Sequence, residues 1–189
     1  SLMDNNPFAF ITASSALERK QVSRFVHRTF NGEDMLFFIE ALRNIYLHHG
    51  GLEEVFSQPW IQSGSMRLAL IHFHHLFFSI PFPERSRKHI ADVERNSAAK
   101  RLNLFLRWMV RPDNQGVDFG IWKRIPPSAL MLPLDIHTGR VARNLGLLRR
   151  NQNDWKAVEE VTAVLRELDP LDPIKYDFAL FGLGMFEGF

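Results

Sequence analysis

The chain has 189 residues, of which 46% are hydrophobic and none is cysteine. Such a length and composition suit a single domain with a sizeable core. The lack of cysteine excludes disulfides, thiolate zinc sites, a cysteine nucleophile and cysteine-ligated iron–sulfur clusters.

The net charge of +2 is distributed unevenly along the chain. Residues 85–156 hold 15 Lys/Arg and 6 Asp/Glu, whereas the rest of the chain holds 8 and 15. A basic middle indicates an anionic partner such as DNA or RNA, although arginines paired with acids elsewhere in the fold would give the same count. No apolar run of about 18 residues and no signal peptide is present, so we expect a cytoplasmic protein without a membrane partner.

Apolar residues recur at helical spacing along most of the chain, and strand-like alternation is scarce, which predicts an all-α protein. Helices are expected over 15–30, 33–47, 63–79, 97–110, 137–145 and 154–168 and from 173 onward, with a short helical turn at 52–56. Helix 97–110 is the clearest of them, with Ser97 as its N-cap and a stripe of apolar residues on one face.

Lys100 lies near the start of that helix, where a basic residue is unusual because the helix dipole places partial positive charge there. This field and the neighbouring Arg101 would favour a neutral amine, which can attack a sugar carbon and form a Schiff base. An ordinary exposed lysine is the alternative.

Asp135 precedes helix 137–145 and is expected to be its N-cap. The same carboxylate could stabilise positive charge that develops on a deoxyribose, or accept a proton from the lysine or from water. A purely structural cap is the alternative, and the two roles are compatible.

Polar and aromatic residues on these two helices are candidates for contacts with a nucleic acid, through phosphates or through stacking on an extruded base. They are Arg101, Asn103, Arg107, Trp108, His137, Arg140 and Arg143. A solvated face, or a core position for Trp108, is the alternative. His72 and His75 share a helix face, but no acidic residue completes a metal site, so neither a metal nor another cofactor is expected.

Three sequence blocks, 99–111, 133–146 and 175–184, resemble an uncharacterised bacterial family, domain of unknown function 2400. That family looks like a divergent branch of the helix-hairpin-helix DNA glycosylases, closest in layout to the archaeal 8-oxoguanine glycosylases. The resemblance implies that Lys100 and Asp135 are the catalytic pair. The glycine hairpin usual before the lysine is absent, and residues 94–97 stand in its place. Relatives extend further at the N-terminus, so a helix of the base pocket is expected to lie outside this sequence.

The resemblance implies a two-lobed helical fold, with about 31–130 in one lobe and 1–30 plus 131–189 in the other. It also implies a DNA base-excision N-glycosylase, with lyase activity where the lysine forms a Schiff base. The absent glycine hairpin and the uneven charge fit a non-catalytic nucleic-acid-binding helical module equally well. A helical protein-interaction domain that binds no nucleic acid is the third possibility.

Overall fold

A computed structural model describes residues 3, 5–113 and 116–186 of the chain. It is mostly helical, as predicted, with one short antiparallel hairpin. In chain order the elements are α1 (Pro7–Ala13), α2 (Ala16–Lys20), the 3-10 helix η1 (Gln21–Arg24), β1 (Val26–His27), β2 (Phe30–Asn31), α3 (Gly32–His48), α4 (Leu52–Ser63), α5 (Met66–Phe77), η2 (Glu84–His89), α6 (Lys100–Val110), η3 (Pro127–Ala129), α7 (Ile136–Asn144), α8 (Trp155–Leu168), η4 (Pro173–Tyr176) and α9 (Asp177–Phe186).

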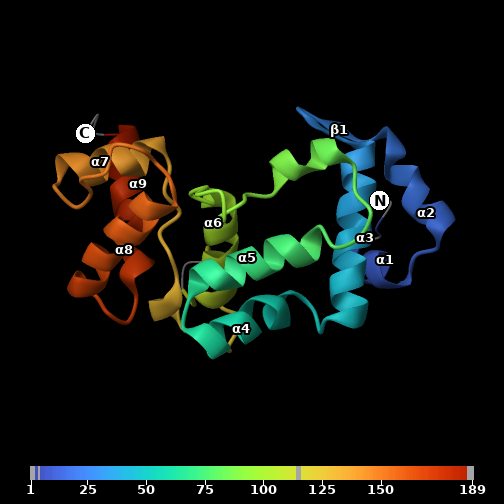
Figure 1. Cartoon of the computed structure of the whole chain (residues 1–189), viewed down its shortest axis with the longest axis horizontal. Coiled ribbons are helices and arrows are strands. Elements are labelled where there is room, and N and C mark those ends of the chain that lie inside the picture. The colour runs from blue at the N-terminus through green and yellow to red at the C-terminus, as the bar shows by residue number, and fades with distance from the viewer. Residues whose placement is uncertain (1–2, 4, 114–115, 187–189) are drawn as a thin grey trace.

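The elements form three groups along the long axis of the molecule (Figure 1). Helices α1 to α3 and the hairpin lie at one end, α4 to α6 in the middle, and α7 to α9 at the other end. The first helix packs against α3, where the rings of Phe8 and Tyr46 meet edge to face at 5.2 Å. The described part of segment 1–30 is therefore far from α7 to α9, which differs from the predicted lobe that joined the two ends of the chain.

The helix predicted over residues 15–30 is wrong in its second half. Helical structure ends at Arg24, and the chain turns back through the hairpin, where Val26 pairs with Asn31. Arg28, in the turn of this hairpin, has a left-handed backbone with φ of 56°. The basic composition of residues 15–30 is also typical of an exposed helix, so it did not reveal the hairpin turn.

The pair Asn31-Gly32 opens α3 directly after the hairpin. Asn31 and Asp34 form a reciprocal capping box at the start of the helix. A Cβ atom on Gly32 would lie 2.0 Å from the carbonyl oxygen of Ser23. Glycine at this position therefore allows α3 to begin directly against η1.

Two further helix boundaries differ from the prediction. Helix α4 continues to Ser63 with Pro59 inside it, whereas the predicted turn ended at residue 56. Helix α6 begins at Lys100 and not at Ser97, because Asn96 and Ala99 take left-handed backbone angles, with φ of 66° and 49°. Lys100 is thus the first residue of its helix, and no side chain caps the helix start.

The core continues through an extended segment that leads to α7. Residues 130–134 are all buried, and the backbone amide of Leu132 donates to the hydroxyl of Thr162 on α8 at 3.1 Å. Arg166 of α8 also donates to the carbonyl of Leu130 at 3.2 Å. Because these two bonds hold the segment against α8, the residue that follows it, Asp135, has a defined position.

Asp154 caps α8 and also holds the segment that precedes α6. Its carboxylate accepts from the amide of Ala157 at 3.1 Å, from Nδ2 of Asn96 at 2.8 Å and from Nε of Arg150 at 2.7 Å. The hydrogen bond from Arg150 is the largest cause that lowers the pKa of Asp154 from 3.8 to about 2. The folded state therefore gains stability from the ionised carboxylate above the unfolded pKa, and loses it as the pH falls through about 2.

Replacing Asp154 with asparagine should therefore destabilise the protein in a pH-dependent way. Asparagine still caps the helix, but it removes the charge that pairs with Arg150. We expect Asp154→Asn to lower the free energy of unfolding at about pH 7 and to have a smaller effect at about pH 2, where wild type also loses the charge. Urea unfolding at both pH values measures this. An equal loss at both values would contradict the assignment.

Candidate active site

The starts of α6 and α7 bring together a lysine and an aspartate that are far apart in the sequence. Nζ of Lys100 donates to Oδ2 of Asp135 at 2.7 Å. Oδ1 of Asp135 accepts from the amide of Thr138 at 2.8 Å, so the predicted N-cap is confirmed. Asn153 also donates to the backbone carbonyl of Asp135 at 3.0 Å. One carboxylate oxygen therefore holds the helix while the other faces the amine.

The hydrogen bonds to Asp135 set the electrostatics of its carboxyl group. Burial tends to raise the pKa of Asp135, but the hydrogen bonds from Lys100 and from the Thr138 amide outweigh it, so that the pKa lies below its ordinary value. Asp135 is therefore an ionised carboxylate within hydrogen-bond distance of the Lys100 amine, placed to accept a proton from it. The predicted neutral amine stays a prediction.

The pair opens into a pocket of about 190 Å³ between α6, the 133–138 segment and α9. Its lining residues are Lys100, Leu104, Pro133, Asp135, Thr138, Asp177, Phe178 and Phe181. An engineered apolar cavity of roughly 150 Å³ holds one benzene molecule, so this pocket has room for about one ring. Apolar walls around a few ionisable groups are typical of ligand-binding pockets.

Asp177, which sequence reasoning missed, adds a second carboxyl group to the pocket. It is the first residue of α9, and it is 6% exposed. Burial raises the pKa of Asp177, although the charge of Arg107 acts in the opposite direction. Asp177 therefore adds a buried acidic group to the wall of the pocket. The signal that could have pointed to Asp177 is its place in the sequence, as a single acidic residue at the start of an apolar stretch.

Arg107, predicted to contact DNA, is buried and cannot do so in this structure. Its side chain is 1% exposed and donates from Nε and Nη2 to Oδ2 of Asp118, each at 3.1 Å. Nη1 donates to Asp177 at 2.6 Å. The guanidinium carbon also lies 3.9 Å from the centroid of the Phe178 ring. Two buried carboxylates require a cation between them, so Arg107 belongs to the core and links α6 to α9.

The other candidates on α6 divide between core and surface. Asn103 is 1% exposed and donates from Nδ2 to the carbonyl of Ala98 at 3.2 Å, so its predicted nucleic-acid contact is wrong. Trp108 is 37% exposed but does not line the pocket, where Leu104 is the α6 residue one turn after Lys100. Arg101 is exposed beside Lys100.

The candidates on α7 are partly used by the protein itself. The ring of His137 packs edge to face with Phe181 at 6.3 Å. Arg143 donates from Nε to the carbonyl of Arg150 at 2.7 Å and thereby holds the loop before α8. Arg140 donates to the carbonyl of Gly184 at 2.7 Å, but it is exposed overall. Arg101 and Arg140 are therefore the predicted cations near the pocket that remain accessible.

Neither a metal centre nor a membrane span is evident in the part of the chain that the structure describes. Within it, no three His, Asp or Glu side chains gather to ligate a metal ion. None of its helices combines the length and the apolar character needed to cross a bilayer.

Comparison with known proteins places the chain in a family. A family model described as "Protein of unknown function (DUF2400)" matches residues 1–186, and the chain belongs to this family. No curated protein and no solved structure matches the chain. The resemblance seen in the sequence is thus confirmed for this family, whereas the likeness to helix-hairpin-helix DNA glycosylases stays a prediction.

Proposed function

We propose that this member of a family of unknown function is a DNA N-glycosylase that acts through a lysine Schiff base. The supporting observation is the contact of 2.7 Å between the Lys100 amine and the Asp135 carboxylate at the mouth of a ring-sized pocket. A lysine whose proton acceptor is within hydrogen-bond distance can be activated as a nucleophile. A target base would enter the pocket only after it is flipped out of the duplex.

The proposed reaction uses Asp135 first as a proton acceptor and then as a proton donor. Asp135 takes a proton from Lys100, and the freed amine forms a bond to C1′ of the deoxyribose while the bond from C1′ to the base breaks. The leaving base takes up the proton that Asp135 received from Lys100, so that Asp135 becomes a carboxylate again. Opening of the sugar ring then gives the Schiff base, and water releases Lys100. Asp135 also stabilises the positive charge that develops on the sugar.

Phosphates of the DNA backbone would lie along the exposed starts of α6 and α7. Arg101 and Arg140 are accessible cations on these helices. No side chain caps the start of α6, where the helix dipole favours an anion. These contacts would position the strand without reading its sequence.

Borohydride trapping against duplexes that each carry one modified base or an abasic site tests this proposal. Borohydride reduces a Schiff base to a stable covalent adduct, which a denaturing gel resolves. We expect wild type to form an adduct with at least one duplex and Lys100→Gln to form none, because the amide cannot attack. Lys88→Gln is the matched control, since Lys88 is exposed on η2 and should leave the adduct unchanged. Adducts formed by Lys100→Gln, or no adduct and no excision by wild type, would contradict the enzyme.

A non-catalytic nucleic-acid-binding module is the second candidate, and one observation favours it. The Lys100 side chain is 45% exposed and paired with Asp135, which is also the geometry of a structural salt bridge. In a binding module, Lys100→Gln should weaken DNA or RNA binding by one phosphate contact and reduce the salt dependence by about one charge. In the proposed enzyme the same change should leave binding nearly intact and remove turnover.

A further inference from the structure

The loop between α7 and α8 lies against both segments that carry the proposed catalytic pair. On one side, Asn96, which precedes α6, donates from Nδ2 to the carboxylate of Asp154 at 2.8 Å. Its carbonyl accepts from the amide of Trp155 at 3.0 Å. On the other side, Nδ2 of Asn153 donates to the backbone carbonyl of Asp135 at 3.0 Å. One short loop is therefore bonded to the start of α7 and to the segment before α6.

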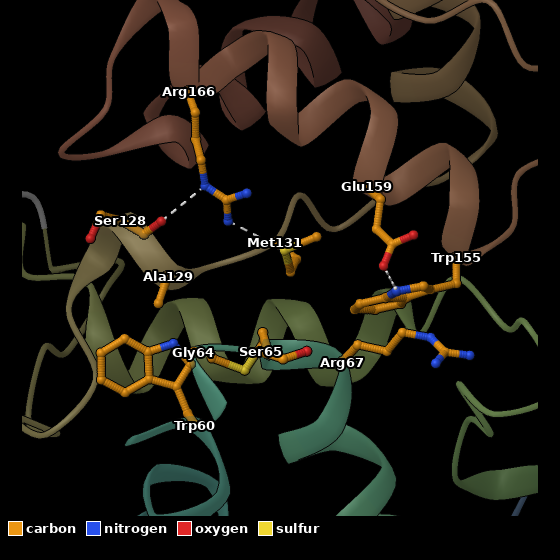
Figure 2. A pocket seen from close by; sticks show the side chains of 11 residues that line it. Trp60, Gly64, Ser65, Arg67, Ser128, Ala129, Met131, Trp155, Glu159 and Arg166 are labelled. Atoms are coloured by element: carbon orange, nitrogen blue, oxygen red, sulfur yellow. Dashed lines mark hydrogen bonds between the residues drawn. The ribbon is translucent and has the colours of Figure 1, made fainter. Parts of the chain in front are cut away.

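Helix α8 fixes most of the chain that leads to Asp135. Figure 2 shows Arg166 of α8 directed at the carbonyl of Ser128, to which its Nε donates at 3.1 Å. Its Nη2 donates to the carbonyl of Leu130 at 3.2 Å. These bonds do not reach Asp135, and there the attachment comes from Asn153 in the loop before α8.

Gly139 gives the Asn153 side chain room to lie against α7. A Cβ atom on Gly139 would be 2.7 Å from Oδ1 and 3.0 Å from Nδ2 of Asn153, closer than side chains approach one another. Glycine is less favourable than alanine inside a helix, and the close approach of Asn153 is the physical reason for glycine here. Oδ1 of Asn153 also accepts from Nη2 of Arg143 at 2.6 Å. Both polar atoms of the amide are used, so its orientation is fixed.

The backbone carbonyl of Asp135 is held by two donors. It accepts from the amide of Gly139 at 2.9 Å, which is a helical bond of α7, and from Asn153 at 3.0 Å. The second bond comes from outside the helix and opposes movement of its first turn. The carboxylate of the same residue meets the Lys100 amine at 2.7 Å. A shift of the backbone at Asp135 therefore alters this contact.

We propose that Asn153 is a positioning residue, which holds the backbone of Asp135 so that its carboxylate stays within reach of the Lys100 amine. The effect on catalysis rests on the proposed function, whereas the hold on Asp135 is measurable without DNA. Asn153 does not line the pocket of about 190 Å³ beside Lys100 (the Lys100 pocket), so it acts through Asp135 and not on the substrate. Misplacement of a reacting group by about 1 Å can cost roughly 100-fold in rate.

Titration of the Asp135 carboxyl carbon by ¹³C NMR in the full chain tests this hold, with the signal assigned by its loss in Asp135→Asn. Burial tends to raise the pKa of Asp135, but the hydrogen bonds from Lys100 and from the Thr138 amide keep it below its ordinary value. Asn153→Ala loosens the start of α7 and should raise this pKa. Asn151→Ala is the matched control, because Asn151 is exposed in the same loop and takes no part in these contacts.

Gly139→Ala tests the same contact from the side of α7. Alanine favours a helix more than glycine does, but its Cβ displaces the Asn153 amide. We expect Gly139→Ala to raise the pKa of Asp135, as Asn153→Ala does. In the Asn153→Ala background it should have little further effect, because the group that it displaces is already absent. Additive effects of the two changes would contradict the contact.

Excision assays separate the positioning role from the function itself. On a duplex that wild type processes, Asn153→Ala should lower the single-turnover rate constant by about 10- to 100-fold and leave the affinity for DNA unchanged. Weaker binding at an unchanged rate constant would overturn the positioning role, as would equal Asp135 pKa values in wild type and Asn153→Ala. No excision by wild type would overturn the N-glycosylase alone, because the titration still reports the hold on Asp135.

Discussion

Asp135→Asn should reduce base excision by roughly 10²- to 10⁴-fold on any duplex that the wild-type protein processes. Asparagine retains the oxygen that caps α7 through the Thr138 amide, so the helix start should be preserved. It cannot accept the proton of Lys100, nor does it carry the negative charge that stabilises a cationic sugar. Single-turnover assays with saturating protein measure the chemical step directly.

Stability provides the control for this prediction. The ion pair to Lys100 is half exposed on the lysine side, so its loss should change the free energy of unfolding by no more than about 1 kcal/mol. Asp135→Ala should cost about 1 kcal/mol more, because alanine also removes the cap. Full excision by a folded Asp135→Asn protein would show that Asp135 is a structural cap alone.

Arg107→Met should destabilise the protein by about 3–5 kcal/mol, the largest loss that we expect from a single substitution. Methionine has a similar shape, but it leaves the carboxylates of Asp118 and Asp177 buried without their cation. Arg111 also contacts Asp118 at 2.9 Å and can compensate in part at that end. A loss of this size corresponds to a fall of roughly 10 °C in Tm for a chain of this length.

The matched control for this prediction is Arg101→Met on the same helix. Arg101 is exposed, so its replacement should change the free energy of unfolding by no more than about 0.5 kcal/mol. Chemical unfolding of both variants compares a buried arginine with a solvated one at equal change of charge. Equal stabilities would mean that the buried network contributes nothing.

Local signals predicted the helix starts well where the start depends on one side chain. The cap at Asp135 is confirmed, because a capping residue acts on an amide two or three positions ahead. The start of α6 was misplaced by three residues, since Ser97 looks like a cap in sequence. The helix starts later because Asn96 and Ala99 have a left-handed backbone. Glycine at these positions would have indicated that conformation in the sequence.

The candidate site was predictable only in part. The role of a charged residue depends on whether its side chain is buried, and the sequence pattern does not reveal this. Lys100 and Asp135 were singled out by position at helix starts and by the family resemblance, and the structure brings them into contact. Arg107 looked like an exposed cation, since nothing in a helical pattern reveals partners 11 and 70 residues away. Asp177 was missed for the same reason. Long-range ion pairs leave no periodic signal.

The network around Arg107 also constrains how related sequences can vary. Replacing a complete buried ion-pair group with apolar residues is often neutral, whereas losing one member is costly. Relatives should therefore keep Arg107, Asp118 and Asp177 or exchange them together. Of these three residues, Asp177 also lines the Lys100 pocket. Selection that conserves Asp177 would therefore also conserve its partner Arg107 and, through Arg107, Asp118. Covariation of these three positions, with Asp177 the least variable, is the pattern expected from that geometry.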